Sequence, residues 1–277
     1  MKKKSFSPWW IVAFTFAIVW LVITAAPFYY LIVTSLKTMG EFLSGGLFQM
    51  PGSFNLANYA RVFQGRFLTY FLNSVVLILV SLSLLLLLAA MAAYPLSRMK
   101  FRFNRPIYSV IVAAMSVPIY ITLIPVFVMM IRTGAYDTLW ALIGPNIAFN
   151  LPMSVFILTS FMQGIPRELE EAVEIDGCGK FGAFFKIILP LSTSGLATLG
   201  IYNGVVIWNE FSFAMVLTQS PYARPLPLAV WDYQGQYSSN IPVIMAVLTL
   251  SALPIILLYI LGQDKLVKGM MAGAVKG

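Results

Sequence analysis

The sequence carries few side chains that could perform chemistry of their own. It contains no histidine, and its only cysteine is Cys178. The absence of histidine excludes serine–histidine and cysteine–histidine nucleophiles, the HExxH zinc motif and haem ligation by histidine. A single cysteine forms neither an internal disulfide nor a cysteine-based metal site. We therefore expect no catalytic residue, no metal site and no cofactor bound by this chain.

A glycine pattern at Gly177, Gly179 and Gly182 matches the GxGxxG spacing of dinucleotide-binding loops. That motif follows an apolar strand and opens a helix, whereas an acidic run precedes it here. Lys180 is followed by Phe181, where a phosphate-binding P-loop needs serine or threonine. We therefore expect this chain to bind no nucleotide.

Glu210, preceded by Asn209, is the one ionisable residue within an apolar stretch. A carboxyl at bilayer depth costs roughly 3 kcal/mol on insertion scales, so it must face protein or water and find a partner. Two interpretations remain open. Asn209 and Glu210 line a polar translocation path, or Glu210 is a paired structural carboxyl near the outer interface.

The segment 164–194 is acidic in its first half and apolar in its second. Pro166 followed by carboxylates predicts the start of a short helix, because proline fits a first turn and acids suit the positive end of the helix dipole. Gly177 predicts a left-handed helix end. The second half predicts a short interfacial helix broken at Pro190. Periodicity alone indicates a solvated acidic helix.

The elements that position these residues follow from composition. Hydrophobic residues make up 60% of the 277 residues and charged residues only 10%, with a mean hydropathy of +0.85. Soluble domains have about 45–50% and 25%, so this is a membrane protein. We expect an all-α polytopic fold forming a single transmembrane domain over 1–277. The predicted spans are 9–33, 69–95, 106–131, 139–163, 195–218 and 241–262.

The basic residues orient the predicted spans. None lies within a span, and 13 of the 18 fall in the alternate segments that include both termini. The positive-inside rule therefore places the N and C termini in the cytoplasm and the loop 219–240 outside. The net charge of +8 reflects this orientation and gives no support to nucleic-acid binding. The basic start followed by a long apolar run predicts an uncleaved helix, not a signal peptide.

Proline and glycine inside the spans indicate how the helices pack. Prolines that break the helical hydrogen-bond ladder need neighbouring helices or a wet cavity to satisfy the freed carbonyls, which favours a packed bundle. Gly200 and Gly204 allow close approach of another helix, and packing within this subunit is favoured over a subunit contact. The prolines concerned are Pro118, Pro125, Pro145, Pro152 and Pro254.

The loop 219–240 is rich in aromatic residues and contains three prolines within 221–227. Tyrosine and tryptophan are enriched both at protein interfaces and in membrane aromatic belts. Two interpretations stay open: a projecting loop that contacts a partner, or an interfacial anchor for the sixth span.

The spacing from Glu171 to Pro190 resembles the EAA loop of ABC importer permeases. Glu171-Ala172-Val173, three residues, Gly177, nine residues and Ile187-x-Leu189-Pro190 meet the pattern EAA-x3-G-x9-I-x-L-P, with Val173 in place of the second alanine. Together with Trp208-Asn209-Glu210-Phe211 and the ending 272–277, the whole chain resembles the smaller permease of the maltose-type carbohydrate importers.

This resemblance implies the type I ABC importer fold and a bacterial or archaeal plasma membrane location. It implies four kinds of partner: a second permease, two cytoplasmic ATPase subunits that use ATP and Mg²⁺, an extracytoplasmic sugar-binding protein and membrane lipid. The implied substrate is an oligosaccharide or related polyol. The implied ATPase-coupling residues are Glu171, Ala172, Val173, Asp176, Gly177, Ile187, Leu189 and Pro190. The implied binding-protein contacts are Tyr222, Arg224 and Trp231.

The competing hypothesis is an ion-coupled secondary transporter in which Glu210 relays protons. Such carriers usually show internal repeats and several intramembrane ionisable residues. The sequence shows one such residue and no convincing repeat. A purely structural scaffold would leave the proline-broken spans and the EAA spacing unexplained.

Overall fold

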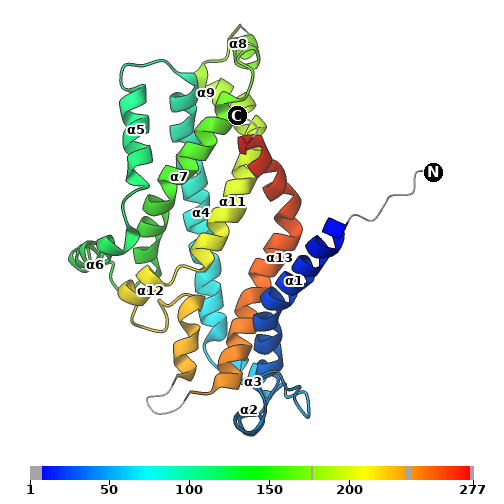
Figure 1. Cartoon of the computed structure of the whole chain (residues 1–277). Coiled ribbons are helices and arrows are strands. Elements are labelled where there is room, and N and C mark those ends of the chain that lie inside the picture. The colour runs from blue at the N-terminus through cyan, green and yellow to red at the C-terminus, as the bar shows by residue number, and fades with distance from the viewer. Residues whose placement is uncertain (1–7, 176, 235–238, 275–277) are drawn as a thin grey trace. The chain divides into compact units, whose positions relative to one another are not determined.

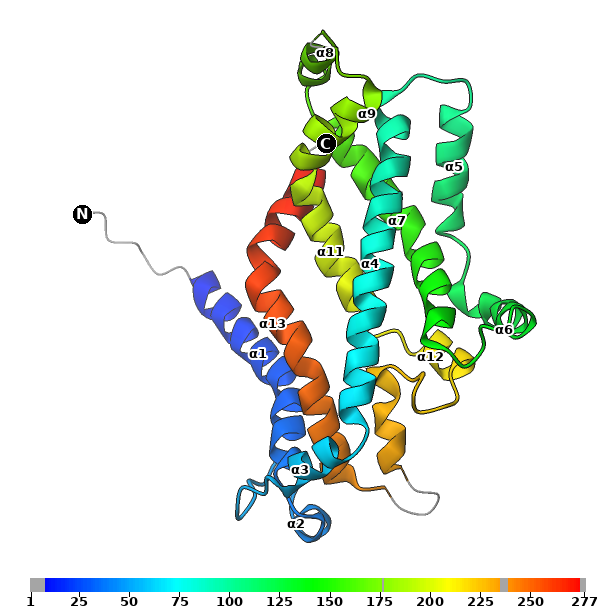
Figure 2. The same cartoon turned by 180° about the vertical axis from the view of Figure 1, so that it is seen from behind.

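The computed structural model describes residues 8–175, 177–234 and 239–274, and within them the regular structure is helical apart from one isolated β-bridge between Gln234 and Ser239. The chain divides into two compact units. Figures 1 and 2 show the helices of each unit from opposite sides.

The first unit comprises 1–67 and 230–252. Thr38 and Glu41 form a reciprocal capping box at the start of its second helix. The buried Asn58 donates through Nδ2 to the carbonyls of Ser35 and Lys37, both at 2.8 Å, and so ties the third helix to the end of the first. Its helices are α1 (Pro8–Ser35), α2 (Met39–Ser44), α3 (Ala57–Gln64) and the first part of α13 (Ile241–Ala274).

The second unit comprises 68–229 and 253–277. Its core is made where α4, α7, the π-helical turn η3 and α11 meet, with Ala93, Leu158, Met162, Ile188 and Leu199 all buried. Its elements are α4 (Phe67–Arg98), α5 (Asn104–Ala114), η1 (Ile119–Thr122), α6 (Leu123–Arg132), η2 (Leu139–Leu142), α7 (Ile143–Gln163), α8 (Glu168–Ile175), α9 (Lys180–Ala183), η3 (Phe184–Ile188), α10 (Leu189–Leu191), α11 (Thr193–Trp208), α12 (Ser212–Leu217), the first part of η4 (Leu226–Tyr233) and the last part of α13.

Four stretches of the described chain are long and apolar enough to span a membrane by themselves: 9–35, 67–98, 139–163 and 241–263. Two further pairs of helices reach that length only if each bent pair is one span. The structure therefore holds four to six candidate spans.

The predicted span 106–131 is bent in the structure, close to one of the prolines expected to break its helical ladder. The helix α5 ends at Ala114, and the chain resumes in η1 and α6 after a bend of 91°. Pro118, with ψ of 124°, precedes the bend because proline and the residue before it disfavour a continuing helix. The expected helix 195–218 is also broken, since α11 ends at Trp208 and α12 begins at Ser212.

The predicted break at Pro190 falls two residues later. Pro190 lies in the first turn of α10, where its missing N–H is tolerated. The chain bends by 68° between Leu191 and Thr193. The Ile188 carbonyl accepts hydrogen bonds from both the backbone N–H of Ser192, at 2.9 Å, and Ser192 Oγ, at 2.7 Å.

Gly200 and Gly204 pack within this subunit. A β-carbon added at either glycine would lie 3.8 Å from a leucine methyl of α4, Leu86 or Leu82 respectively. The within-subunit interpretation of this glycine pair is the one the structure supports.

Candidate coupling loop and membrane cavity

The acidic helix α8 forms as the sequence predicts. Glu168, Glu170 and Glu171 lie in its first turn, where carboxylates favour the positive end of the helix dipole. Gly177 has φ of +82°, a left-handed conformation that favours glycine. The predicted left-handed stop is confirmed, and the result is a short helix with a defined end.

The coupling residues expected on α8 are turned outward. Glu171 and Ala172 are exposed, and Val173 is half-buried. Leu169 is 44% exposed on the same helix. Asp176 lies outside the described residues. The surface that carries the EAA pattern is therefore open to a partner protein.

The neighbouring Glu170 points the other way and fastens α8 to the end of α4. Its Oε2 lies 3.4 Å from Arg98 Nε, in an ion pair whose side chains are 14% and 3% exposed. Tyr94 donates its hydroxyl to Glu170 Oε1 at 2.6 Å, and Arg98 donates through Nη2 to the Ile165 carbonyl at 2.8 Å. Sequence reasoning missed Tyr94, Arg98 and Glu170 as a set, because no spacing rule brings residues so distant in sequence together.

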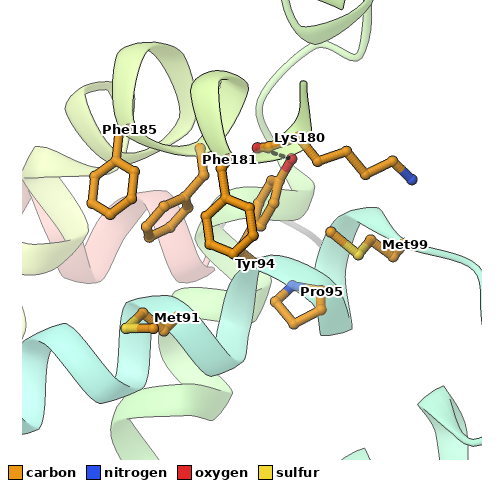
Figure 3. A pocket seen from close by; sticks show the side chains of 8 residues that line it. Met91, Tyr94, Pro95, Met99, Lys180, Phe181 and Phe185 are labelled. Atoms are coloured by element: carbon orange, nitrogen blue, oxygen red, sulfur yellow. Dashed lines mark hydrogen bonds between the residues drawn. The ribbon is translucent and has the colours of Figure 1, made fainter. Parts of the chain in front are cut away.

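The second half of the loop packs on the same end of α4. The Tyr94 ring lies 5.1 Å from the buried Phe184 ring, and its hydroxyl is 3.2 Å from the Lys180 carbonyl (Figure 3). An apolar cavity of about 190 Å³ lies between α4 and the second half of the loop, and its lining includes Met91, Pro95 and Phe181.

The coupling residues expected at the end of the pattern differ in solvent exposure. Ile187 and Leu189 are half-buried and pack against the core of the second unit, while Pro190 is exposed. Their position fits a packing role, which holds the loop on the bundle. The exposed members of the predicted set are Glu171, Ala172, Gly177 and Pro190.

Glu210 lies between α11 and α12. Its carboxylate accepts hydrogen bonds from the backbone N–H groups of Phe213 at 2.7 Å and Ala214 at 3.0 Å, which caps α12. Asn209 donates through Nδ2 to the Val205 carbonyl at 2.8 Å. Glu210 is thus a partnered carboxyl, as the structural alternative expects. It also lines a cavity of about 320 Å³, together with residues of α7.

The residues expected to contact a binding protein are divided between the two compact units. Tyr222 is 78% exposed, Arg224 is half-buried, and Trp231 belongs to the other compact unit. Asn73 of α4 donates through Nδ2 to the carbonyls of both Tyr222 and Arg224, at 2.8 and 2.9 Å. Residues 235–238 of the expected loop lie outside the described residues.

Asp137 holds the start of the same segment and was also missed by sequence reasoning. Its Oδ1 accepts the backbone N–H groups of Gln219 and Ser220, both at 2.7 Å. Burial alone would raise the pKa of the Asp137 carboxyl, but hydrogen bonds from Ser220 and Gln219 and the charge of Arg224 hold that pKa below its usual value. The carboxylate is therefore held charged against the loop.

No group of three or more Asp, Glu, Cys or His side chains suited to a metal ion is found in the part of the chain that the structure describes.

Comparison with known proteins assigns the family. The family model of binding-protein-dependent transport system inner membrane components matches residues 85–271. The chain is 53% identical to a Caldicellulosiruptor protein named "Putative ABC transporter permease protein ORF2", over 95% of this chain and 96% of the relative. It is 36% identical to the sulfoquinovosyl glycerol transport system permease protein SmoH of Agrobacterium fabrum, over 91% and 88% of the two chains.

A solved structure shares the fold. A chain in the crystal structure of a bacterial ABC transporter involved in alginate import superposes with a TM-score of 0.82 and 21% identity, over 95% of this chain and 98% of that one. These matches give no support to the ion-coupled alternative. The chain belongs to the binding-protein-dependent transport system inner membrane components, and it is a multi-pass permease subunit of an ABC transporter.

Proposed function

We propose that this chain is one of two permease subunits of an ATP-driven importer of oligosaccharides or related polyols, with six spans and both termini in the cytoplasm of a bacterial or archaeal cell. Family membership carries the transporter assignment. The sugar class is supported by relatives named for diacetylchitobiose, for melibiose, raffinose and stachyose, and for arabinooligosaccharides.

The ATPase subunits dock, in this proposal, on the outward face of α8. Glu171 and Ala172 are exposed there, whereas Glu170 is bound to α4 through Tyr94 and Arg98. A helix that is open on one side and fastened on the other transmits a push as a rigid body. ATP and Mg²⁺ act in the ATPase, and this chain takes no part in the hydrolysis.

The extracytoplasmic binding protein docks, in this proposal, on the segment that contains Tyr222 and Arg224. Its course is held by Asn73 and Asp137, so the exposed Tyr222 side chain is presented at a fixed place. A solved alginate transporter with similar fold is in complex with an oligosaccharide-bound periplasmic protein, which supports this arrangement.

A charge reversal at Glu171 tests the proposal. The complex of this chain with its permease partner, ATPase and binding protein is reconstituted in proteoliposomes, and uptake of raffinose, diacetylchitobiose and arabinotriose is measured with ATP inside. We expect Glu171→Lys to abolish uptake and sugar-stimulated ATP hydrolysis without lowering complex yield. The matched control is Glu168→Lys, an exposed acid of the same turn outside the pattern, for which uptake persists.

Uptake at the wild-type rate by the Glu171→Lys complex contradicts the coupling role. Uptake that survives ATP depletion while a proton gradient is maintained contradicts the ABC mechanism itself.

A further inference from the structure

The cavity beside Glu210 lies at two interruptions of helical structure in the second unit, the one between α5 and η1 and the one between α11 and α12. Ala114, Met115 and Val117 at the break before η1 line one side, and Glu210 and Phe213 at the break after α11 line another. The α7 helix, which contains Pro145 and Pro152, provides a further wall. In membrane proteins, non-helical backbone at membrane depth is tolerated where it is buried in protein or lines a water-filled cavity, and transporter substrates bind at such discontinuities.

A stripe of polar residues on α7 borders this cavity. Asn146, Asn150 and Ser154 are spaced by four residues, and each donates to the carbonyl four residues earlier at 2.8 Å. Asn146 and Asn150 line the cavity. Each asparagine uses one of its two amide N–H groups in this way, so its second N–H group and its acceptor oxygen remain for a ligand.

One of those acceptors has no partner among the described residues. Asn146 is 3% exposed, and its Oδ1 accepts no hydrogen bond. An unsatisfied buried acceptor costs about 1–3 kcal/mol, so its presence in a cavity wall points to a donor that arrives with a ligand. Glu210 presents a second acceptor on the other side of the cavity.

The remaining walls are apolar, and the cavity size suits a small molecule. Phe149 and Phe213 stack with ring centroids 5.5 Å apart and both line the cavity. Its volume of about 320 Å³ lies at the lower end of the range for small-molecule sites, roughly 300–1,000 Å³. No lysine or arginine lines it. A ligand that donates hydrogen bonds, has an apolar face and bears no negative charge fits these walls.

We propose that this cavity is a saccharide subsite inside the permease, in which Asn146 and Glu210 accept hydrogen bonds from the hydroxyl groups of a neutral sugar while Phe149 packs against an apolar face of its ring. This inference rests on the proposed function and extends it. All the residues that line it in this structure come from this subunit, and it disfavours sugar acids because the Glu210 carboxylate, and no lysine or arginine, lines the cavity.

A pair of adjacent valines gives a matched test. Val206 and Val205 are both half-buried on α11, but Val206 lines this cavity whereas Val205 lines a different, apolar hollow beside α4. In a Cys178→Ser background, Val206→Cys and Val205→Cys each provide a single thiol in a chain that is otherwise free of cysteine. A small methanethiosulfonate reagent is applied to the assembled complex with binding protein and a non-hydrolysable ATP analogue.

The probes are raffinose, diacetylchitobiose and arabinotriose, each added separately. We expect the sugar that supports wild-type uptake to slow labelling of Val206→Cys several-fold and to leave Val205→Cys unchanged. Equal labelling rates at Val206→Cys with and without a transported sugar overturn the inference, as does the absence of labelling in both conditions, which indicates a closed dry cavity. If wild-type uptake of every probe fails, the proposed carbohydrate function is contradicted instead.

A second measurement keeps the residue assignment falsifiable. Asn146→Ala should lower uptake at subsaturating sugar by about three- to tenfold, the value of one neutral hydrogen bond. The matched control is Thr159→Ala, because Thr159 is a buried residue of the same helix whose Oγ1 is also unpartnered among the described residues but which does not line the cavity. Equal effects of the two substitutions refute the assignment of Asn146.

Discussion

The two loops attached to the ends of α4 are held in different ways. At the last turns of α4, Tyr94 donates a hydrogen bond to the side chain of Glu170, and Arg98 forms an ion pair with it. At its first turns, Asn73 and Ser74 instead bond to backbone groups of the segment around Tyr222. In the proposed orientation, the attachment at the last turns is cytoplasmic and depends on the identity of a loop side chain, whereas the outer attachment, at the first turns, tolerates changes of loop side chain. Under the proposed function, this difference gives a fixed coupling helix and an outer loop that is free to match its binding protein.

The largest effect is expected from breaking the side-chain attachment. Glu170→Ala leaves Arg98, which is 3% exposed, without its carboxylate, and removing one partner of a buried pair costs about 3–5 kcal/mol. We expect a marked fall in the thermal unfolding temperature of the purified complex and loss of sugar-stimulated ATP hydrolysis. Glu168→Ala, at an exposed position of the same turn, serves as control. An unchanged unfolding temperature in Glu170→Ala would show that the ion pair does not hold the loop.

The next effect concerns the end of α8. A residue with a β-carbon in the left-handed conformation of Gly177 costs about 1–2 kcal/mol, although no atom within 4 Å would obstruct it. We expect Gly177→Ala to reduce coupled ATP hydrolysis several-fold and Gly177→Pro to abolish it. Asparagine populates this conformation more readily, so Gly177→Asn should retain most of the activity. Identical losses in the alanine and asparagine variants would argue against the backbone explanation.

The stability of the outer attachment should depend more on the Asn73 side chain than on the Tyr222 side chain. Asn73→Ala removes two hydrogen bonds to the carbonyls of Tyr222 and Arg224, at about 1 kcal/mol each. Faster amide hydrogen exchange at 222–224 is expected in that variant and not in Tyr222→Ser, which keeps the carbonyl. Both variants should lower binding-protein-dependent uptake, the second through lost contact. Faster amide exchange at 222–224 in Tyr222→Ser than in Asn73→Ala would contradict the role given to Asn73.

The smallest effect is the pH dependence of the outer loop. The pKa of Asp137 is held below its ordinary value, so its contribution to stability is complete above about pH 4 and is lost as the pH falls through the lowered pKa. Amide exchange at 219–220 should accelerate in that acidic range. Asp137→Asn tolerates the same φ of 58° and should remove the pH dependence while exchange stays fast at neutral pH. If amide exchange at 219–220 still accelerated at acidic pH in Asp137→Asn, the pH dependence would belong to another titratable group.

Composition and local rules predicted the helical class, the acidic helix and the left-handed Gly177, because apolar runs and turn residues act over a few positions. Pro118 indicated a broken helical ladder within 106–131, but the 91° bend could not be derived, since a proline within an apolar run is compatible with a kink as well as with a full break. Two roles for Glu210 were compatible with the sequence, which did not distinguish between them. The structure shows its bonds to the Phe213 and Ala214 amides and its place in a cavity wall.

The attachments to α4 could not be derived from sequence. Tyr94 and Glu170 are far apart in the chain, as are Asn73 and Tyr222, and only the packed bundle brings each pair together. The three acids within 168–171 are equivalent by residue type, and only their positions around the helix separate the half-buried Glu170 from the exposed Glu171.

The most direct test of the central claim is photo-cross-linking from the exposed face of α8. A benzoylphenylalanine in place of Ala172 is irradiated in the assembled complex, with the same probe in place of the exposed Tyr222 as the comparison. We predict that the probe at position 172 forms an adduct with the ATPase subunit. The probe at position 222 should form an adduct with the binding protein and none with the ATPase. An ATPase adduct from position 222, or its absence from position 172, would contradict the account.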